Sequence, residues 1–542
     1  MKRTLKIYYT SDTHGHLFPA GDGRGGSMLQ CFHKFKKDGN TLILDGGDTI
    51  QGSPLIKFLR EKGRLEEVLS RAFDEAGYDY FTLGNHDFNY GREKLKDFLK
   101  AMGARCLAAN VKDIRGELPV RAWTVHTLEN GLRVGICGAV TDCVNLWEAK
   151  ENLEDLQVTD AFEAVKQALE EMKRECDVTV CIYHGGYERD LETGEVLCQG
   201  KENMACQMLS RLDFDLLLTA HQHMETEGRE INGTYTLQLP PNGEKYARVE
   251  VTVDDGGESG PAAGKAEERL SGDALAAGMP GDRLPEEPDK NRAGGSGRKT
   301  EISARLVSPG KEISPSLMKE LEPVRREEEV WKERVIGTLA QEIPAQELLE
   351  RAMNGTALAD LGNQVQLWIT GADMACIGMA NVPVGLGRQV KLGDMLRVYP
   401  FPNRQVVLTV TGEILKAALE RCASYFDLED GKVVISQRFT KPKEEHYNYD
   451  YYAGVEYTAD LRRPVGERVT EILVKGRPAE MEKTYTLAMS DYRATGTGGY
   501  ECFRSCPPPR AYPGDMQSSI ISYLESHPEA EIKPLGKLHL IY

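Results

Sequence analysis

The stretch GNHDFNYG at residues 84–91 places an amide, an imidazole and a carboxylate at three consecutive positions, Asn85, His86 and Asp87. It follows the apolar run Tyr80–Leu83, which has the length and composition of a buried strand. In α/β sheets, ligands collect beyond the carboxyl ends of the strands. Polar groups at this position are therefore candidates for binding a ligand or a metal ion.

The same pattern occurs four more times in the first half of the chain, where an apolar run is followed by residues that bind metals in other proteins. The runs and the residues after them are Leu5–Tyr9 with Asp12 and His14, Thr41–Leu44 with Asp48, Val178–Ile182 with His184, and Phe214–Leu218 with His221 and His223. Helix-like stretches such as Ala161–Cys176 lie between the runs. This alternation of strands and helices predicts an α/β domain.

Seven side chains from these strand ends offer nitrogen or oxygen ligands, and they are Asp12, His14, Asp48, Asn85, His184, His221 and His223. Side chains two apart on a strand face the same way, so Asp12 and His14 are expected to reach one ion together, as are His221 and His223. Mixed nitrogen and oxygen ligands favour Zn, Mn, Fe or Co. Seven groups suffice for two ions if one carboxylate bridges them, and two ions about 3.5–4 Å apart can clamp a phosphoryl group.

Length and charge limit the alternatives. A chain of 542 residues exceeds one hydrophobic core, so about two or three domains are expected. The net charge of -17 disfavours a nucleic-acid polymer or a membrane as partner.

No apolar run approaches the roughly 20 residues that span a bilayer, and the first residues lack the apolar core of a signal peptide. With 12 cysteines that show no paired spacing, the sequence predicts a cytoplasmic location and carries no signal for the oligomeric state.

The composition changes from Asp254 to about residue 300, where glycine, proline and charged residues dominate. Such a segment buries too little surface to fold, so we interpret it as a flexible insertion. The flanking runs, Ala247–Val253 and Glu301–Val307, alternate like two strands. The insertion is therefore expected to be the loop of a hairpin or a linker between domains.

The second half differs in character. QVVLTVTGEILKAALERCASYF, at 405–426, predicts a strand, a helix cap at Thr411 or Gly412, and an amphipathic helix. The half has no clustered His/Asp pattern, which suggests a substrate-binding role. We expect a metal-binding domain at 1–315, a connector helix at 316–335 and a substrate-binding domain at 336–542.

The order Asp12-x-His14, Gly47-Asp48, Gly84-Asn85-His86-Asp87, His184 and His221-x-His223 resembles the calcineurin-like metallophosphoesterase superfamily. The second half is similar to the C-terminal domain of the 5′-nucleotidase family in DMLRVYPFPNRQVVLTVTGEILKAALE and YTLAMSDYRATGTGGY. GNHDFNYG, HYNYDYYAGVEYTADLRRPVGERV and DYRATG resemble the 2′,3′-cyclic-nucleotide 2′-phosphodiesterase/3′-nucleotidase branch. The resemblance implies an αββα sandwich followed by a smaller α/β domain.

The resemblance also implies roles for individual residues. One metal would be held by Asp12, His14, Asp48 and His223, and the other by Asp48, Asn85, His184 and His221, with Asp48 as the bridge. His86 would lie beside the scissile phosphate, with Asp87 as a further candidate catalytic residue. The nucleobase would bind between Phe401 and Tyr492, near Asn403.

One position departs from the family pattern. Plain 5′-nucleotidases commonly place an aspartate three residues after the active-site histidine, and here that residue is Asn89. The departure agrees with the cyclic-phosphodiesterase branch and leaves open whether Asp87 or another group orients His86.

The expected function is two-metal hydrolysis of nucleotide phosphoesters, foremost as a 2′,3′-cyclic-nucleotide 2′-phosphodiesterase/3′-nucleotidase. The mechanistic hypothesis is in-line attack by metal-bound hydroxide, with His86 stabilising the transition state or protonating the leaving ribose oxygen. The alternatives are a 5′-nucleotidase, a hydrolase of nucleotide sugars or other phosphoesters, and a nucleotide-binding scaffold without activity.

Overall fold

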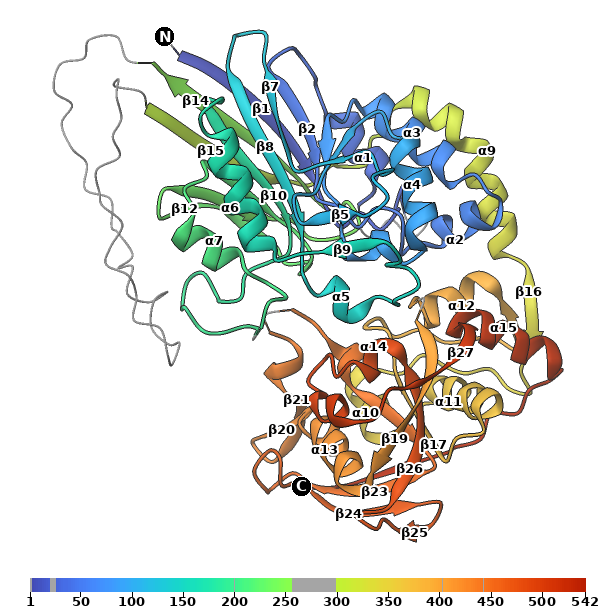
Figure 1. The fold of residues 1–542 in the computed structure, drawn as a ribbon. Coiled ribbons are helices and arrows are strands. Elements are labelled where there is room, and N and C mark those ends of the chain that lie inside the picture. Colours follow the sequence, from blue (N-terminus) through green and yellow to red (C-terminus); the bar gives the residue numbers. More distant parts are fainter. Residues whose placement is uncertain (1, 20–25, 199, 256–298, 402, 442) are drawn as a thin grey trace. The chain divides into compact units, whose positions relative to one another are not determined.

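The computed structural model describes residues 2–19, 26–198, 200–255, 299–401, 403–441 and 443–542 (Figure 1). The chain divides into two compact units, Met1–Glu322 and Pro323–Tyr542. Most of the predicted insertion lies outside the described residues. The division falls inside the helix α9 (Pro315–Lys332), which covers most of the segment predicted as a connector, and the predicted domain limits stay a prediction.

Two sheets form the centre of the first unit. The first sheet, in spatial order, is β15 (Lys299–Val307), β14 (Tyr246–Asp254), β1 (Lys2–Thr10), β2 (Thr41–Asp45), β3 (Tyr80–Phe81), β4 (Arg105–Leu107) and β6 (Val120–Arg121). The second sheet is β12 (Thr226–Ile231), β13 (Thr234–Gln238), β11 (Leu216–Thr219), β10 (Val178–His184), β8 (Arg133–Val140) and β7 (Trp123–Thr127). A separate pair joins β5 (Val111–Asp113) to β9 (Leu156–Val158). The strands β1, β2, β3 and β4 are parallel, as are β8, β10 and β11, so their carboxyl ends lie at one edge of each sheet.

Apolar residues from both sheets form one continuous core. It includes Leu5, Ile7, Leu42, Leu44, Ile136, Val180, Ile182 and Leu216, none of which is exposed. Fully burying an aliphatic side chain of this kind stabilises a fold by about 1.5–3 kcal/mol. Because these strands are buried on both faces, their sequences are continuous apolar runs.

Helices cover the outer faces of the two sheets (Figure 1). The helices of this unit are α1 (Met28–Lys34), α2 (Pro54–Glu61), α3 (Leu65–Ala76), α4 (Gly91–Ala101), α5 (Val144–Trp147), α6 (Ala161–Met172) and α7 (Ala205–Arg211), with a 3₁₀ turn, η1 (Asn85–Phe88). On one side, α6 and α7 pack on β8 and β10 through Val165 and Met208. On the other, Phe32 of α1 and Phe73 of α3 pack together with 6.0 Å between ring centroids. The predicted αββα sandwich is therefore confirmed.

The predicted elements differ from the structure mainly at their ends. The strand β3 is only Tyr80–Phe81, shorter than the apolar run, because the chain turns into η1 at Asn85. The helix α6 ends at Met172 and not at Cys176. The two runs around the insertion pair as antiparallel neighbours from Tyr246 opposite Val307 to Asp254 opposite Lys299, so the hairpin interpretation is confirmed for the described strands.

The second unit is built on a mixed five-stranded sheet and a separate four-stranded sheet. The first contains β22 (Asp450–Ala453), β17 (Met374–Gly378), β26 (Thr484–Ser490), β19 (Arg404–Thr411) and β27 (Arg510–Asp515), and the second β25 (Arg477–Pro478), β24 (Val469–Val474), β23 (Val455–Asp460) and β28 (Lys537–Ile541). Two smaller pairs are β16 (Val335–Thr338) with β18 (Gln389–Lys391) and β20 (Phe426–Glu429) with β21 (Lys432–Ile435). The helices are α10 (Leu348–Asn354), α11 (Ala357–Thr370), α12 (Leu392–Val398), α13 (Gly412–Ala423), α14 (Asp491–Ala494) and α15 (Met516–Ser526), and the 3₁₀ turns are η2 (Gln437–Phe439), η3 (His446–Asn448) and η4 (Glu501–Ser505).

The helix α13 follows β19 directly, as predicted, and buries Leu415, Ala418, Leu419 and Cys422. Phe426, the last residue of the stretch predicted to end in an amphipathic helix, lies on β20 because the helix ends at Ala423. Of the helices in the described part of the chain, none is long and apolar enough to cross a membrane.

Thr411 caps α13, and we expect its removal to destabilise the second unit. Its side-chain oxygen accepts a hydrogen bond from the backbone N–H of Ile414. The substitution Thr411→Ala should lower the free energy of unfolding by about 1 kcal/mol, because a backbone donor in the first turn loses its partner. Chemical denaturation measures the change. Thr411→Ser keeps the acceptor oxygen and should be nearly neutral, and an equal loss in both variants would contradict the capping role.

Candidate metal centre

The seven predicted ligands follow five strands that belong to different sheets. β1, β2 and β3 of the first sheet precede Asp12, His14, Asp48 and Asn85, while His184 ends β10 and His221 and His223 follow β11. Backbone hydrogen bonds tie these loops together, since the N–H of Asp12 donates to Gly47 O at 3.0 Å and the N–H of His14 donates to Asp48 O at 2.8 Å. The loops are thus held in position by hydrogen bonds to one another.

Five of the seven residues adopt a left-handed backbone conformation. Their φ angles are 50° for Asp12, 47° for His14, 57° for Asp48, 74° for His221 and 58° for His223. Such φ angles in residues other than glycine cost of order 1–3 kcal/mol each and cluster at functional sites. The argument that Asp12 and His14, or His221 and His223, share one face of a strand is therefore wrong, because these residues lie in turns beyond β1 and β11.

Asp12, His14, Asp48 and His223 form the first of two overlapping groups. Their ligand atoms all lie within 4.8 Å of one another. Nε2 of His14 lies 3.0 Å from Nε2 of His223, which in turn lies 3.5 Å from Oδ1 of Asp12. Two imidazole nitrogens this close to each other and to a carboxylate are suited to a divalent cation.

The second group brings Asn85, His184 and His221 to Asp48. Oδ1 of Asn85 lies 2.9 Å from Nδ1 of His221 and 3.2 Å from Nε2 of His184. The same Nε2 of His184 lies 3.3 Å from Oδ2 of Asp48. Asp48 is therefore shared by both groups, and the turn that carries it packs tightly, because a Cβ added to Gly84 would lie 2.1 Å from Oδ1 of Asp48.

Groups outside the centre fix the orientation of three of the imidazoles. Nδ1 of His14 donates to Gln51 O at 3.0 Å, Nδ1 of His184 donates to Gly46 O at 2.6 Å, and Nε2 of His221 donates to Oε1 of Glu202 at 3.2 Å. In each ring the other nitrogen is left to face the centre, as in metal-binding histidines generally. The contribution of Glu202 was not predicted, and nothing in its local sequence distinguishes it from other glutamates.

The charges of the centre are strongly perturbed by burial. Burial lowers the pKa of His14 to about 3, despite the nearby Asp48. Burial also acts to lower the pKa of His184, but Asp48 and Asp12 outweigh it and raise the pKa to about 10. For Asp48, burial acts to raise the pKa, and His184 and His86 outweigh it, so the pKa is well below its usual value. The centre therefore stabilises negative carboxylates that a cation can bind.

The residues present fit a bound cation. Among the residues that the structure describes, Oδ2 of Asp12 is a buried carboxylate oxygen with no hydrogen-bond partner. An unpaired charged oxygen of this kind is costly unless a cation or donor compensates it. The centre has two carboxylates, one of which carries this oxygen, and four imidazoles, and these are suitable ligands for a divalent metal.

His86 and Asp87 have different surroundings. The half-buried ring of His86 faces the side chain of Asn89, with 2.9 Å between Nδ1 and Oδ1. The buried carboxylate of Asp87 accepts backbone N–H bonds from Asp48, Thr49, Ile50 and Gly84 at 2.8–3.1 Å. Asp87 thus anchors the turn that carries Asp48, which differs from the catalytic role predicted for it.

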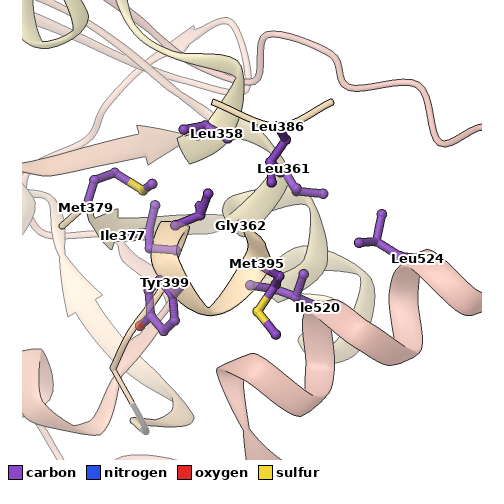
Figure 2. Close-up of a pocket in the computed structure, with 11 residues that line it drawn as sticks. Leu358, Leu361, Gly362, Ile377, Met379, Leu386, Met395, Tyr399, Ile520 and Leu524 are labelled. Carbon is purple, nitrogen blue, oxygen red and sulfur yellow. The ribbon is translucent and has the colours of Figure 1, made fainter. Parts of the chain in front are cut away.

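The predicted base-binding residues lie in the second unit. The ring of Phe401 lies 5.3 Å from that of Tyr399 and 6.2 Å from that of Tyr447. Tyr492 lies beside Arg493, whose guanidinium is 5.8 Å from the Tyr492 ring, and Asn403 accepts the backbone N–H of Met516 with its carbonyl oxygen. Figure 2 shows that Tyr399 lines an apolar pocket with side chains such as Leu361, Ile377 and Met395, which belongs to the core and has no charged lining residue.

Two family models match the chain. The model described as calcineurin-like phosphoesterase matches residues 5–225, and the model described as 5′-nucleotidase, C-terminal domain, matches residues 335–505. The chain therefore contains a calcineurin-like phosphoesterase domain followed by a 5′-nucleotidase C-terminal domain, and it is a hydrolase. Calcineurin-like phosphoesterases use a dinuclear centre of divalent metals, and the Asp/His cluster described above is the candidate for it in this chain.

Several proteins are similar to this chain over most of its length, at low sequence identity. The trifunctional nucleotide phosphoesterase protein YfkN of Bacillus subtilis is 24% identical over 92% of this chain, which spans only 36% of that longer protein. A 2′,3′-cyclic-nucleotide 2′-phosphodiesterase/3′-nucleotidase of Haemophilus influenzae is 24% identical over 91% of this chain and 80% of its own length. A crystal structure of a Staphylococcus aureus protein provisionally assigned as a 5′-nucleotidase is similar with a TM-score of 0.83 and 27% identity, covering 100% of both chains.

Proposed function

We propose that this hydrolase cleaves nucleotide phosphoesters at a two-metal centre, with 2′,3′-cyclic nucleotides and 3′-nucleotides as its substrates. The observation that carries the proposal is the convergence of seven ligands from five strand ends into two groups that share Asp48. We assign one cation to Asp12, His14, Asp48 and His223, and the other to Asp48, Asn85, His184 and His221. When bound, the cations supply Lewis-acid polarisation of the phosphoryl group.

The protein's own residues then position the substrate and move a proton. The turns held by Asp87 keep the ligands fixed, which preorganises the centre for the charge of the transition state. His86 has its Nδ1 occupied by Asn89, so Nε2 is the nitrogen available to the substrate. We assign to Nε2 the role of stabilising the transition state or protonating the leaving ribose oxygen.

Two observations favour the cyclic-nucleotide branch. Asn89 stands where plain 5′-nucleotidases commonly have an aspartate. Relatives from Haemophilus influenzae and Salmonella typhimurium at 24% and 23% identity carry the name 2′,3′-cyclic-nucleotide 2′-phosphodiesterase/3′-nucleotidase. The second candidate is a 5′-nucleotidase, which the full-length similarity to the Staphylococcus aureus structure favours.

A substrate panel separates these candidates. The protein is purified, its metals are measured per chain, and hydrolysis is assayed with Mn²⁺ and 2′,3′-cyclic, 3′- and 5′-nucleotides and a nucleotide sugar. We expect the highest kcat/KM with 2′,3′-cyclic and 3′-nucleotides. A preference for 5′-nucleotides would establish the second candidate, and no turnover of any member would refute the proposed substrate class.

The proposal includes stacking of the base on Phe401 and Tyr492. Phe401→Ala or Tyr492→Ala should raise KM for nucleotides roughly 5- to 150-fold, because a stacked base contributes about 1–3 kcal/mol. Steady-state kinetics measure the change, with 4-nitrophenyl phosphate as a substrate that lacks a base. An equal loss with both substrates would show that the rings serve folding and do not bind the base.

We also propose that the protein acts in the cytoplasm. Free thiols such as Cys137 and Cys181 are fully buried within the sheets, which suits a reducing compartment. Fractionation of the source cells with an antibody against the chain tests this, and recovery outside the cytoplasm would refute it.

A further inference from the structure

A chain of hydrogen bonds runs outward from His86 to a glutamate distant in sequence. Nδ1 of His86 lies 2.9 Å from Oδ1 of Asn89, and Nδ2 of Asn89 donates to Oε2 of Glu148 at 2.6 Å. All three side chains are half-buried. Glu148 follows directly after α5, and 59 positions separate it from Asn89.

The other hydrogen bonds described for the Glu148 carboxylate are all with donors. Its Oε1 accepts the backbone N–H of Ala149 at 2.7 Å and a side-chain N–H of Asn152 at 2.8 Å. Nδ2 of Asn152 also donates to the backbone oxygen of Asn89 at 2.9 Å, which ties the two loops together. A carboxylate only accepts hydrogen bonds, so this environment matches an ionised Glu148.

These contacts determine which way the Asn89 amide points. Because the Glu148 carboxylate accepts, Asn89 must turn its NH₂ group toward it and its oxygen toward His86. The oxygen can only accept, so Nδ1 of His86 must be the nitrogen that carries a proton. Nε2 is then left to face the substrate, which is the orientation that an aspartate beside an active-site histidine otherwise provides. To donate to the transition state or to the leaving oxygen, Nε2 must carry a proton of its own, so this role requires a ring that is protonated at both nitrogens.

Asp87, the residue next to His86, cannot replace Glu148 in this role. Its two oxygens already accept four backbone N–H bonds from the turns at 48–50 and 84. The segment that carries Glu148 also supports the metal centre, since the ring of Trp147 stacks on that of His221 with 5.5 Å between centroids and 21° between planes. Trp147 thus contacts a candidate metal ligand, while its neighbour Glu148 contacts Asn89, which faces His86.

We propose that Glu148 and Asn89 are positioning residues of the active site, in which the carboxylate acts through the amide to fix the orientation of His86 and the proton on its Nδ1. The inference rests on the proposed function only in the assumption that His86 faces the substrate. In the expected pattern a carboxylate at position 89 contacts the histidine directly. Here the carboxylate is that of Glu148, and the amide of Asn89 lies between it and His86.

Exchanging the two functional groups tests this arrangement. Glu148→Gln keeps an oxygen for Ala149 and Asn152 and turns an NH₂ group toward Asn89, which must then turn its own NH₂ group toward His86. Asn89→Asp places two carboxylates face to face, which disfavours their ionisation. In the double variant Asn89→Asp/Glu148→Gln, the new carboxylate at position 89 again accepts from His86, and the new amide at position 148 donates to that carboxylate.

We expect Glu148→Gln to lower kcat roughly 10- to 100-fold with little change in KM or metal content, and the double variant to recover most of the loss. Glu154→Gln, an exposed glutamate six residues further along the chain, is the matched control and should retain the activity of the parent protein. Unchanged kcat in Glu148→Gln, or a double variant no better than Glu148→Gln alone, would overturn the proposal.

A second measurement keeps this inference separate from the substrate assignment. The ring ¹⁵N shifts of His86 in Zn²⁺-loaded, ¹⁵N-histidine-labelled protein, assigned with His86→Asn, report the protonated nitrogen without turnover. We expect a protonated Nδ1 in the parent protein and in the double variant, and an unprotonated Nδ1 in Glu148→Gln. The same protonation state in all three would overturn the proposal, even if the substrate panel gave a different substrate class.

Discussion

Replacing Asp48 by asparagine is expected to reduce turnover by at least roughly 10³-fold and to lower the metal content below two ions per chain. Asp48 is the side chain that we assign to both groups of ligands, with Oδ2 3.3 Å from Nε2 of His184 and 4.0 Å from Nε2 of His14. Polarisation by metals contributes several kcal/mol to transition-state stabilisation, and each 1.36 kcal/mol corresponds to a tenfold change in rate. Elemental analysis and steady-state kinetics on the same preparation measure both effects.

Asparagine is a conservative probe at this position. Position 48 has a φ of 57°, and asparagine adopts the left-handed region more readily than most residues, so the turn should be retained. Asp45→Asn is the matched control, because Asp45 is equally buried and its oxygens contact Thr10, Gly47 and Thr49, outside the ligand groups. The control should keep its metals and turnover. An Asp48→Asn protein with both metals and full activity would contradict the bridging role.

Replacing His86 by asparagine should lower kcat about 10²- to 10⁴-fold while the metal content stays intact. The expected loss is the usual contribution of a residue that transfers a proton in the transition state. The metals should remain because the contact of residue 86 with Asp48 is made by the backbone, whose N–H donates to Oδ1 of Asp48 at 2.8 Å. Kinetics with a nucleotide substrate and metal analysis test both parts.

The leaving group of the substrate separates the two roles assigned to His86. A 4-nitrophenyl ester needs no proton on its leaving oxygen, so His86→Asn should lose less activity with it if the histidine is a general acid. An equal loss with both substrates would indicate stabilisation of transition-state charge. His33→Asn on α1, beside Glu312, is the control and should be nearly neutral, and unchanged turnover in His86→Asn would contradict both roles.

The sequence predicted the positions of the candidate ligands better than their local structure. Asp48 and His184 could be found because each follows an apolar run that is buried on both faces of a sheet. The left-handed turns could not be predicted, because they depend on hydrogen bonds between separate loops, such as that from the N–H of Asp12 to Gly47 O. The strand pattern by itself did not divide these strands between two sheets, and the two-sheet sandwich followed only from the resemblance to a known superfamily.

The groups around the candidate ligands gave no sequence signal. Glu148 and Trp147 lie in NLWEAKE, at residues 145–151, which has neither the spacing nor the composition of a functional motif. Their contacts with Asn89 and His221 arise only when distant loops meet. An inference from local pattern therefore finds candidate metal ligands, and it misses the residues that contact the site from distant loops.

The left-handed turns have a consequence for metal exchange. Their conformations are held by hydrogen bonds between loops and by the sheets beneath them, all of which belong to the protein itself. Removal of the ions should therefore leave the ligand side chains in place. Protein treated with a chelator should then bind metal again quickly, without refolding. Since a rigid set of nitrogen and oxygen ligands discriminates little among Mn²⁺, Fe²⁺, Co²⁺ and Zn²⁺, we expect the supply of ions in the growth medium to determine which metals are recovered.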